Sequence, residues 1–420
     1  MDLTIFRMLP ASSGDACLLT TRRGTYLFDG GTLRGDLSGM LRERRVGKLR
    51  VAVCTSASPE RLGGILELME SGYPVGEYWL PDSLRALAEA ARGFDGGFPD
   101  WFVRCGWSVP VEASFPMPNT MSPVQGGHPL SACAELALLG AAACTGRLPA
   151  EPRPLSPAET FPAVSRMLLS SREAAGNDGL VRMCLDALDR KGGQDLSACA
   201  VLCGRLLADR AEGLAPSTRR VARQAGMTLA LAVMAEGLLA RGDIRVRWFR
   251  QTGRLEEHLV ARHPVMCLNG VEAREIRTEP LRVSASAMLQ AARRISISGN
   301  GLVFRYGDAD CGVLVCGSSR LSFLGRRGFL SLARPTVIAA PQQGDSGGEG
   351  AYGRIRSADP GADVWVRANG FRSRRVAEGF LRQPIRYCLR NCRNRTMQEI
   401  LLVFDRGRWR HLAGGPCTCP

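Results

Sequence analysis

The sequence of 420 residues predicts an α/β fold that is interrupted by a block of helices. Two observations carry this prediction. Short apolar runs alternate with amphipathic segments in the first 110 residues and again from residue 243 onward, which is typical of strands buried between helices. Residues 130–242 lack such runs and have apolar residues at helical spacing instead.

Residues 1–129 form the first half of the predicted sheet structure. An Asp29-Gly30-Gly31 turn closes the third strand, and we interpret Asp29 as a turn residue. The predicted elements, in chain order, are strands Asp2–Leu9, Ala16–Thr21 and Thr25–Phe28, helix Leu33–Arg45, strand Leu49–Thr55, helix Glu60–Ser71, strand Glu77–Leu80 and helix Asp82–Arg92.

Residues 130–242 are predicted to be a helical insertion, after which strands resume. The predicted helices are Phe161–Ala175, Gly179–Asp189, Leu196–Ala211 and Thr218–Ala240. The later strands are Ile244–Phe249, Gly301–Tyr306, Gly312–Cys316, Thr336–Ala340, Ala362–Arg367, Ile385–Leu389, Glu399–Phe404 and Arg408–Leu412. We therefore expect residues 243–385 to complete the sheet structure and residues 386–420 to form a small terminal element that carries cysteines.

The composition favours a cytoplasmic protein with an anionic partner. The net charge is +15, which is typical of proteins that bind nucleic acid or phosphorylated ligands, although a basic surface spread over the whole molecule is the alternative. Residues 1–10 lack a leader pattern, and the most apolar helical stretch, Met227–Ala240, is too short to span a membrane. Fifteen cysteines without an export signal indicate reduced thiols.

Several segments, taken in order, carry a family resemblance. They are Gly14–Leu19, Tyr26–Gly31, Val53–Gly64, Asn300–Phe304, Gly312–Ser318 and Ala340–Gly344. Together they resemble the metallo-β-lactamase superfamily. That family has an opening hairpin ending in Asp-Gly-Gly, the signature Thr-His-x-His-x-Asp-His-x-Gly-Gly, a strand pair ending in Thr-Gly-Asp, and a Pro-His-His-Gly loop. The match most resembles the hydrolase domain of bacterial DNA-uptake (late competence) proteins. It implies an αββα sandwich that holds one or two metal ions at its sheet edges.

The framing residues Thr55, Gly63 and Gly64 fit the family signature, but the metal-ligand positions do not. The residues at those positions are Ser56, Ser58 and Arg61 for histidines, Glu60 for aspartate, Ser318 for the bridging aspartate, Gln342 and Gln343 for two histidines, and Arg372 and Ser373 where a final histidine is expected. A hydrolytic zinc pair needs imidazole and carboxylate ligands and an open position for water. We therefore expect a degenerate site with no catalytic residue and no catalytic metal pair.

The resemblance, with its ligands lost, implies a pseudoenzyme that binds or scaffolds within a multiprotein system, with DNA handling or antiviral defence as the setting. We expect a protein partner; nucleic acid or another anionic ligand is a further candidate, and a membrane is not expected. Two alternatives stay open. One is a metal-dependent hydrolase or phosphodiesterase with non-standard ligands drawn from Asp15, Asp29, Glu60 and Asp345. The other is a sequence-tolerant nucleic-acid-binding protein.

The degenerate site has two interpretations of its own. Arg61, Gln342, Gln343 and Arg372 could donate hydrogen bonds to a phosphate or carboxylate ligand. Alternatively, water and internal hydrogen bonds satisfy these polar groups. The sequence leaves both open.

Cysteines near the end of the chain form a second candidate site. Cys388 and Cys392 make one close pair, and Cys417 and Cys419 make another. Two such pairs resemble the pattern of a structural zinc site, and a hairpin between them would bring the thiols together. His411 is a possible substitute ligand, and uncommitted thiols are the alternative.

Overall fold

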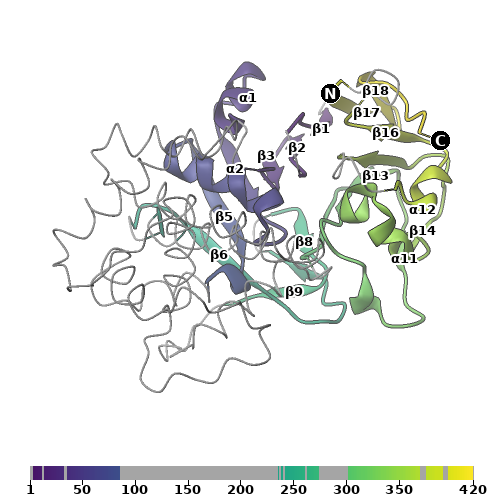
Figure 1. Cartoon of the computed structure of the whole chain (residues 1–420), viewed down its shortest axis with the longest axis horizontal. Helices are drawn as coiled ribbons and strands as arrows, with labels where there is room; N and C mark the ends of the chain where they lie inside the picture. The colour runs from purple at the N-terminus through teal and green to yellow at the C-terminus, as the bar shows by residue number, and fades with distance from the viewer. Residues whose placement is uncertain are drawn as a thin grey trace, which may run out of the picture. The chain divides into compact units, whose positions relative to one another are not determined.

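The computed structural model describes ten stretches of the chain, and the statements below concern only these (Figure 1). They are residues 3–11, 14–32, 36–85, 235, 238–239, 242–260, 263–273, 301–368, 375–390 and 396–419. The chain divides into two compact units, one formed by residues 1–82, 243–275 and 298–420, the other by residues 83–242 and 276–297. The helices predicted between residues 161 and 240 lie outside the described stretches, apart from three helical positions at 235, 238 and 239.

The first unit contains a mixed sheet of nine strands. Their order across the sheet is β18 (Arg408–Ala413), β17 (Ile400–Asp405), β1 (Thr4–Met8), β2 (Cys17–Thr21), β3 (Gly24–Phe28), β4 (Leu49–Val53), β5 (Val75–Pro81), β6 (Val246–Gln251) and β9 (Gly270–Glu272). The four strands β3 to β6 run parallel, and the other neighbours pair antiparallel. The parallel block therefore has all its amino ends at one edge and all its carboxyl ends at the other.

A second mixed sheet has seven strands. Their order is β16 (Arg386–Cys388), β15 (Val364–Arg367), β13 (Thr336–Ala339), β11 (Gly312–Val315), β10 (Phe304–Gly307), β8 (Val265–Cys267) and β7 (His258–Leu259). The strands β16, β15, β13 and β11 are parallel, and the remaining pairs are antiparallel. Two short strands, β12 (Leu330–Leu332) and β14 (Ile355–Ser357), form a separate parallel pair.

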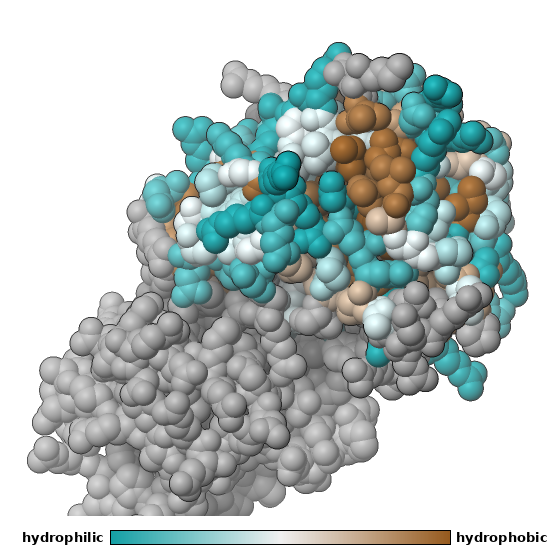
Figure 2. Space-filling view, turned by 90° about the horizontal axis from the view of Figure 1, so that it is seen from above, coloured by the Kyte–Doolittle hydropathy of each residue, from teal (hydrophilic) through white to brown (hydrophobic). Residues whose placement is uncertain are grey.

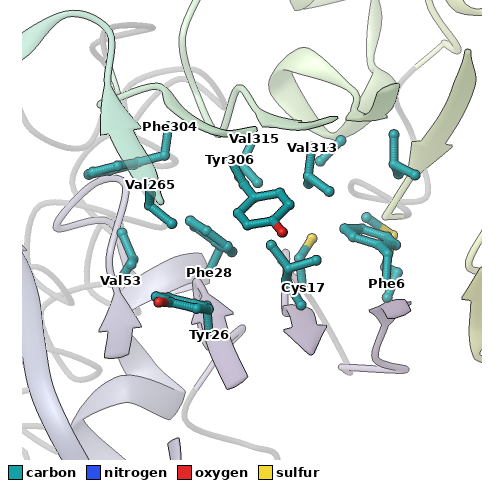
Figure 3. Packing of buried hydrophobic residues seen from close by; sticks show 14 of the residues in the cluster. Phe6, Cys17, Tyr26, Phe28, Val53, Val265, Phe304, Tyr306, Val313 and Val315 are labelled. Atoms are coloured by element: carbon teal, nitrogen blue, oxygen red, sulfur yellow. The ribbon is translucent and has the colours of Figure 1, made fainter. Parts of the chain in front are cut away.

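The two sheets share one hydrophobic core. Figure 3 shows Phe6, Cys17, Tyr26, Phe28 and Val53 of the first sheet on one side of this core, facing residues of the second sheet. The facing residues are Val265, Phe304, Tyr306, Val313 and Val315. Side chains alternate along each strand, so this arrangement uses every second residue and leaves the others to the outer faces. The sheets therefore pack face to face.

Short helices accompany the outer faces. The helices are α1 (Leu37–Glu43), α2 (Pro59–Glu70), η2 (Ser322–Leu324), η3 (Pro341–Gly344), η4 (Ser346–Gly348), α11 (Glu349–Tyr352) and α12 (Glu378–Leu381). Behind the second sheet, Tyr352 of α11 stacks on Trp365 of β15 with ring centroids 5.2 Å apart, and Phe380 of α12 belongs to the same cluster. The α/β class predicted from the sequence is confirmed at this level: two mixed sheets with few helices.

The exposed surface of the described residues is largely hydrophilic in one view, with a compact hydrophobic patch among polar side chains (Figure 2). Within the described stretches no helix combines the length and the apolar character needed to cross a bilayer.

Candidate functional site

Two parallel strands and one helix bring the candidate residues together. Asp29 follows β3 and Thr55 follows β4, so both lie at the carboxyl edge of the parallel block. Helix α2 packs against the turn after β3, and this close contact is possible because Gly30 in the turn and Gly64 in the helix have no side chains. A Cβ on Gly30 would lie 2.5 Å from the backbone nitrogen of Ile65, and one on Gly64 would lie 2.1 Å from the carbonyl oxygen of Gly30. The two glycines therefore set how closely α2 approaches the turn.

Arg61 of α2 is the central charge of the site. The residue is only 3% exposed, and its guanidinium donates from Nη2 to Asp15 Oδ2 at 2.9 Å. Its Nε lies 3.2 Å from Asp29 Oδ2, and its Nη1 lies 3.5 Å from Ser58 Oγ. A buried cation thus lies between two buried carboxylates, in the position where the family resemblance expects a histidine.

Asp29 is more than the turn residue that the sequence suggested. Its φ of 59° is consistent with a turn, yet its side chain is fully buried. Oδ1 accepts a hydrogen bond from the backbone nitrogen of Thr55 at 2.7 Å, and Oδ2 accepts one from Thr55 Oγ1 at 2.8 Å. Asp29 therefore ties the end of β3 to the end of β4 and to the guanidinium of Arg61.

The two carboxylates share a single buried cation. Burial raises the pKa of Asp15 and raises the pKa of Asp29 to about 7, and attraction to Arg61 opposes both shifts. Burial would lower the pKa of Arg61, but the attraction of Asp15 and Asp29 outweighs it and raises that pKa. Since two negative charges face one positive charge, a proton on one carboxyl group balances the charge of the cluster.

Most of the predicted degenerate-site residues converge on this cluster. The hydroxyl groups of Ser56 and Ser58 are 3.0 Å apart, and Gln343 Nε2 donates to Glu60 Oε2 at 3.3 Å. Gln342 Nε2 donates to the carbonyl oxygen of Ser318. Arg372 and Ser373 lie outside the described residues.

The loop that carries the glutamines has an unusual backbone. Gln342 and Gln343 have φ values of 53° and 59°, and Gly344 follows with 76°. Left-handed conformations are costly for residues other than glycine and persist only where surrounding contacts hold them. Here the backbone nitrogen of Gln342 donates to the carbonyl oxygen of Gly317 at 2.9 Å, which fixes the loop against the end of β11.

The donor set does not fit a hydrolytic zinc pair. The residues at the expected ligand positions offer hydroxyl, amide and guanidinium groups and one carboxylate, that of Glu60, which accepts a hydrogen bond from Gln343. The carboxylates of Asp15 and Asp29 are engaged by Arg61. Asp345, another candidate carboxylate, follows the glutamine loop in the sequence and is buried. Its backbone forms an isolated β-bridge with Val376. Arg61 is also unavailable for an external ligand, because burial and two ion pairs use its guanidinium.

The cysteines at the end of the chain form a compact cluster. The sulfur atoms of Cys388, Cys417 and Cys419 lie within 4.8 Å of one another, and those of Cys388 and Cys419 are 3.9 Å apart. A backbone hydrogen bond from Cys417 to the carbonyl oxygen of Arg386, 2.9 Å long, positions the second pair beside β16. These three thiols could hold a metal ion. Cys392 lies outside the described residues.

His411 does not belong to this cysteine group. Its ring stacks on Tyr387 with centroids 4.4 Å apart. Two other cysteines, Cys54 and Cys316, are fully buried, and burial raises the pKa of both thiols well above its ordinary range. They therefore behave as packed thiols rather than as nucleophiles.

Comparison with known proteins found no relative: no protein-family model matches the chain, and a search of curated proteins finds no match.

Proposed function

We propose that this chain is a metallo-β-lactamase-fold protein that has lost its catalytic metal ligands and serves as a binding or scaffold subunit. The order of the motifs in the sequence and the face-to-face packing of two mixed sheets support the finer fold assignment, an αββα sandwich with a helical insertion. One observation carries the functional part. The buried guanidinium of Arg61 pairs with Asp15 and Asp29 at the expected metal edge.

A guanidinium supplies positive charge, as a metal ion does, but it cannot bind a water molecule as a ligand. It compensates buried carboxylates, as Arg61 does here, yet it has no vacant coordination position and cannot lower the pKa of a water molecule by direct ligation. The site thus keeps the electrostatic stabilisation of the fold without a group that activates a nucleophile.

The setting of this binding role rests on the resemblance to DNA-uptake proteins. We propose a protein partner within a multiprotein system that handles DNA or defends against viruses, with an anionic ligand attracted by the charge of +15. No disulfide joins the described cysteines, which supports a cytoplasmic location.

Rebuilding the ligands tests the fold assignment. The variant Ser56→His, Ser58→His, Glu60→Asp, Arg61→His restores the family signature and should gain at least one tightly bound zinc or manganese ion, measured by elemental analysis after dialysis. A matched control places glutamine instead of histidine at the same three positions. If the histidine variant is folded by circular dichroism and holds no more metal than the glutamine control, the superfamily assignment is wrong.

Hydrolysis assays test the non-catalytic part. The unmodified chain should hydrolyse bis(p-nitrophenyl) phosphate no faster than a protein-free control in the presence of Zn²⁺, Mn²⁺ or Mg²⁺. Hydrolysis that disappears in Glu60→Gln and Asp345→Asn variants would favour the alternative, a hydrolase with non-standard ligands.

We further propose that Cys388, Cys417 and Cys419 bind one structural zinc ion, with Cys392 as the fourth ligand. Three buried or half-buried thiols from two segments that are far apart in sequence fit such a site, since thiolates are preferred zinc ligands and the ion would join the end of the chain to β16.

Elemental analysis decides whether the zinc is present. The purified chain should contain about one zinc ion, which Cys417→Ser should remove together with part of the thermal stability. Cys54→Ser is the control, because Cys54 Sγ donates to the carbonyl oxygen of Ser56 at 3.0 Å and a hydroxyl group can do the same. A chain that is purified under reducing conditions, has its thiols reduced and contains no zinc would refute the site.

A further inference from the structure

A basic pocket lies at the edge of the nine-stranded sheet opposite to Arg61. It has a volume of about 550 Å³ and is formed where the parallel strands β3, β4, β5 and β6 begin, with one residue from the segment before β8. The lining residues are Arg23, Gly24, Thr25, Lys48, Arg50, Gly76, Glu77, Arg245, Arg247 and His263.

The cations of this pocket are only partly compensated. Arg247 is engaged, because its Nε donates to Glu77 at 2.7 Å and its Nη1 donates to Glu272 at 3.1 Å. In contrast, the side chains of Arg23, Lys48 and Arg245 are exposed and have no anionic partner within the described part of the chain. Glu77 is the sole acidic residue among those that line the pocket. A concave surface with this excess of positive charge attracts anions.

His263 lines the pocket beside Glu77. The residue is 7% exposed, and its Nδ1 is buried without a hydrogen-bond partner among the described residues. Its Nε2 lies 3.5 Å from Glu77 Oε2, and its ring packs edge-to-face on Trp79, with centroids 5.0 Å apart. Buried polar atoms are nearly always paired, so the Nδ1 atom needs an ordered water molecule or a ligand group as its partner.

We propose that this pocket binds the phosphate groups of a ligand that carries at least two of them. Arginine presents a planar set of donors that matches phosphate oxygens, and lysine adds a point charge. The cations occur at the starts of β3, β4 and β6, and strands lie about 4.8 Å apart, so the row extends over roughly 14 Å. That length suits neighbouring phosphates better than a single carboxylate.

The inference rests on the proposed binding role and gives it a location. The pocket contains none of the degenerate-site residues. The binding experiment below can therefore succeed when the metal and hydrolysis experiments fail, and it can fail when they succeed. The phosphates could belong to a nucleotide-like small molecule or to a nucleic-acid backbone, and two probes separate these sources.

The experiment measures binding of inorganic triphosphate and of a single-stranded 12-nucleotide DNA to the full chain, by titration calorimetry at several salt concentrations. Arg23→Gln, Lys48→Gln and Arg245→Gln together should weaken binding at least tenfold. The control, Arg326→Gln, Arg327→Gln and Arg408→Gln, removes the same charge from exposed sites elsewhere and should change affinity less than twofold.

His263→Phe refines the test, because phenylalanine keeps the aromatic packing and removes both ring nitrogens. It should weaken binding several-fold without changing the salt dependence. Tighter binding of DNA with a steeper salt dependence assigns the phosphates to nucleic acid, and equal or tighter binding of triphosphate assigns them to a small molecule. Equal losses in the pocket triple variant and the control, or no binding of either probe at millimolar concentration, would overturn the proposal.

Discussion

The two edges of the parallel block β3–β6 differ in whether their charged side chains are paired within the chain. At the carboxyl edge, Asp15, Asp29 and Arg61 are buried and compensate one another within the chain. At the amino edge, Arg23, Lys48 and Arg245 are exposed and have no anionic partner among the described residues. Charges paired inside the fold act on stability, whereas charges left unpaired on a concave surface are available to a ligand. The charges at the position that the family resemblance marks as functional are therefore paired within the chain.

Removing Arg61 should have the largest effect on stability. Arg61→Met leaves Asp15 and Asp29 buried without their cation, and breaking a buried ion pair in this way costs about 3–5 kcal/mol of unfolding free energy. Urea denaturation followed by circular dichroism measures the loss.

A compensating variant sharpens this prediction. Adding Asp15→Asn and Asp29→Asn to Arg61→Met removes the uncompensated charges and should recover a substantial part of the lost stability. If the Arg61→Met chain is as stable as the unmodified one, the carboxyl edge does not depend on the buried cation.

The pH dependence of stability should show the next largest effect. The pKa of Asp29 is raised to about 7 in the folded chain, while an unfolded aspartate titrates near its ordinary value of 3.8. Between these values the folded state holds a proton that the unfolded state has lost, so the unfolding free energy falls as pH rises from about 4 to 7 and then levels off. The raised pKa of Asp15 acts in the same direction.

One proton gives a slope of at most about 1.4 kcal/mol per pH unit. Denaturation between pH 4.5 and 8 measures it, and Asp29→Asn should flatten the curve. A slope that is the same in both chains would show that Asp29 does not hold the proton.

Thr55→Val should cost less than the loss of Arg61. The substitution removes the hydroxyl donor to Asp29 Oδ2 but keeps the backbone donor to Oδ1, so we expect a loss of about 1–3 kcal/mol. Thr20→Val is the control, because the Thr20 hydroxyl lies 3.4 Å from that of Thr25 in a less buried place. Equal losses in the two variants would argue against a special role for the Asp29–Thr55 contact.

Neutralising the amino edge should have the smallest effect on stability. Arg23→Gln, Lys48→Gln and Arg245→Gln together should change the unfolding free energy by less than about 0.5 kcal/mol, because exposed and unpaired charges contribute little. A loss comparable with that of Arg61→Met would mean that both edges are structural, and the contrast between them would disappear.

Regular elements with an apolar signal could be predicted from the sequence. The run Leu49–Thr55 predicted β4, and the amphipathic segment Glu60–Ser71 predicted α2 with nearly its observed bounds. The short strands β8 and β9 were missed, because Val265–Cys267 and Gly270–Glu272 are too short to show a periodicity and gain their strand conformation from pairing within the sheets.

The degenerate site was only partly predictable. Its residues could be identified from motif positions, but the pairing of Arg61 with Asp15 joins residues 46 positions apart and depends on how α2 docks on the turn after β3. The basic pocket was missed for a similar reason. Arg23, Lys48 and Arg245 are unremarkable single cations in a chain rich in arginine, and only the parallel order of the strands brings them to one edge.

Strand β1 lies between β2 and β17 in the nine-stranded sheet, and Met8 of β1 pairs with Ile400 of β17. During synthesis the ribosome has to add the intervening residues at about 5–20 per second, so β1 has a free hydrogen-bonding edge for roughly 20–80 s. An edge strand that is open for this long can pair with another nascent chain. Slower translation should therefore lower the yield of correctly folded protein in cells, and a chaperone that shields the first hairpin should raise it.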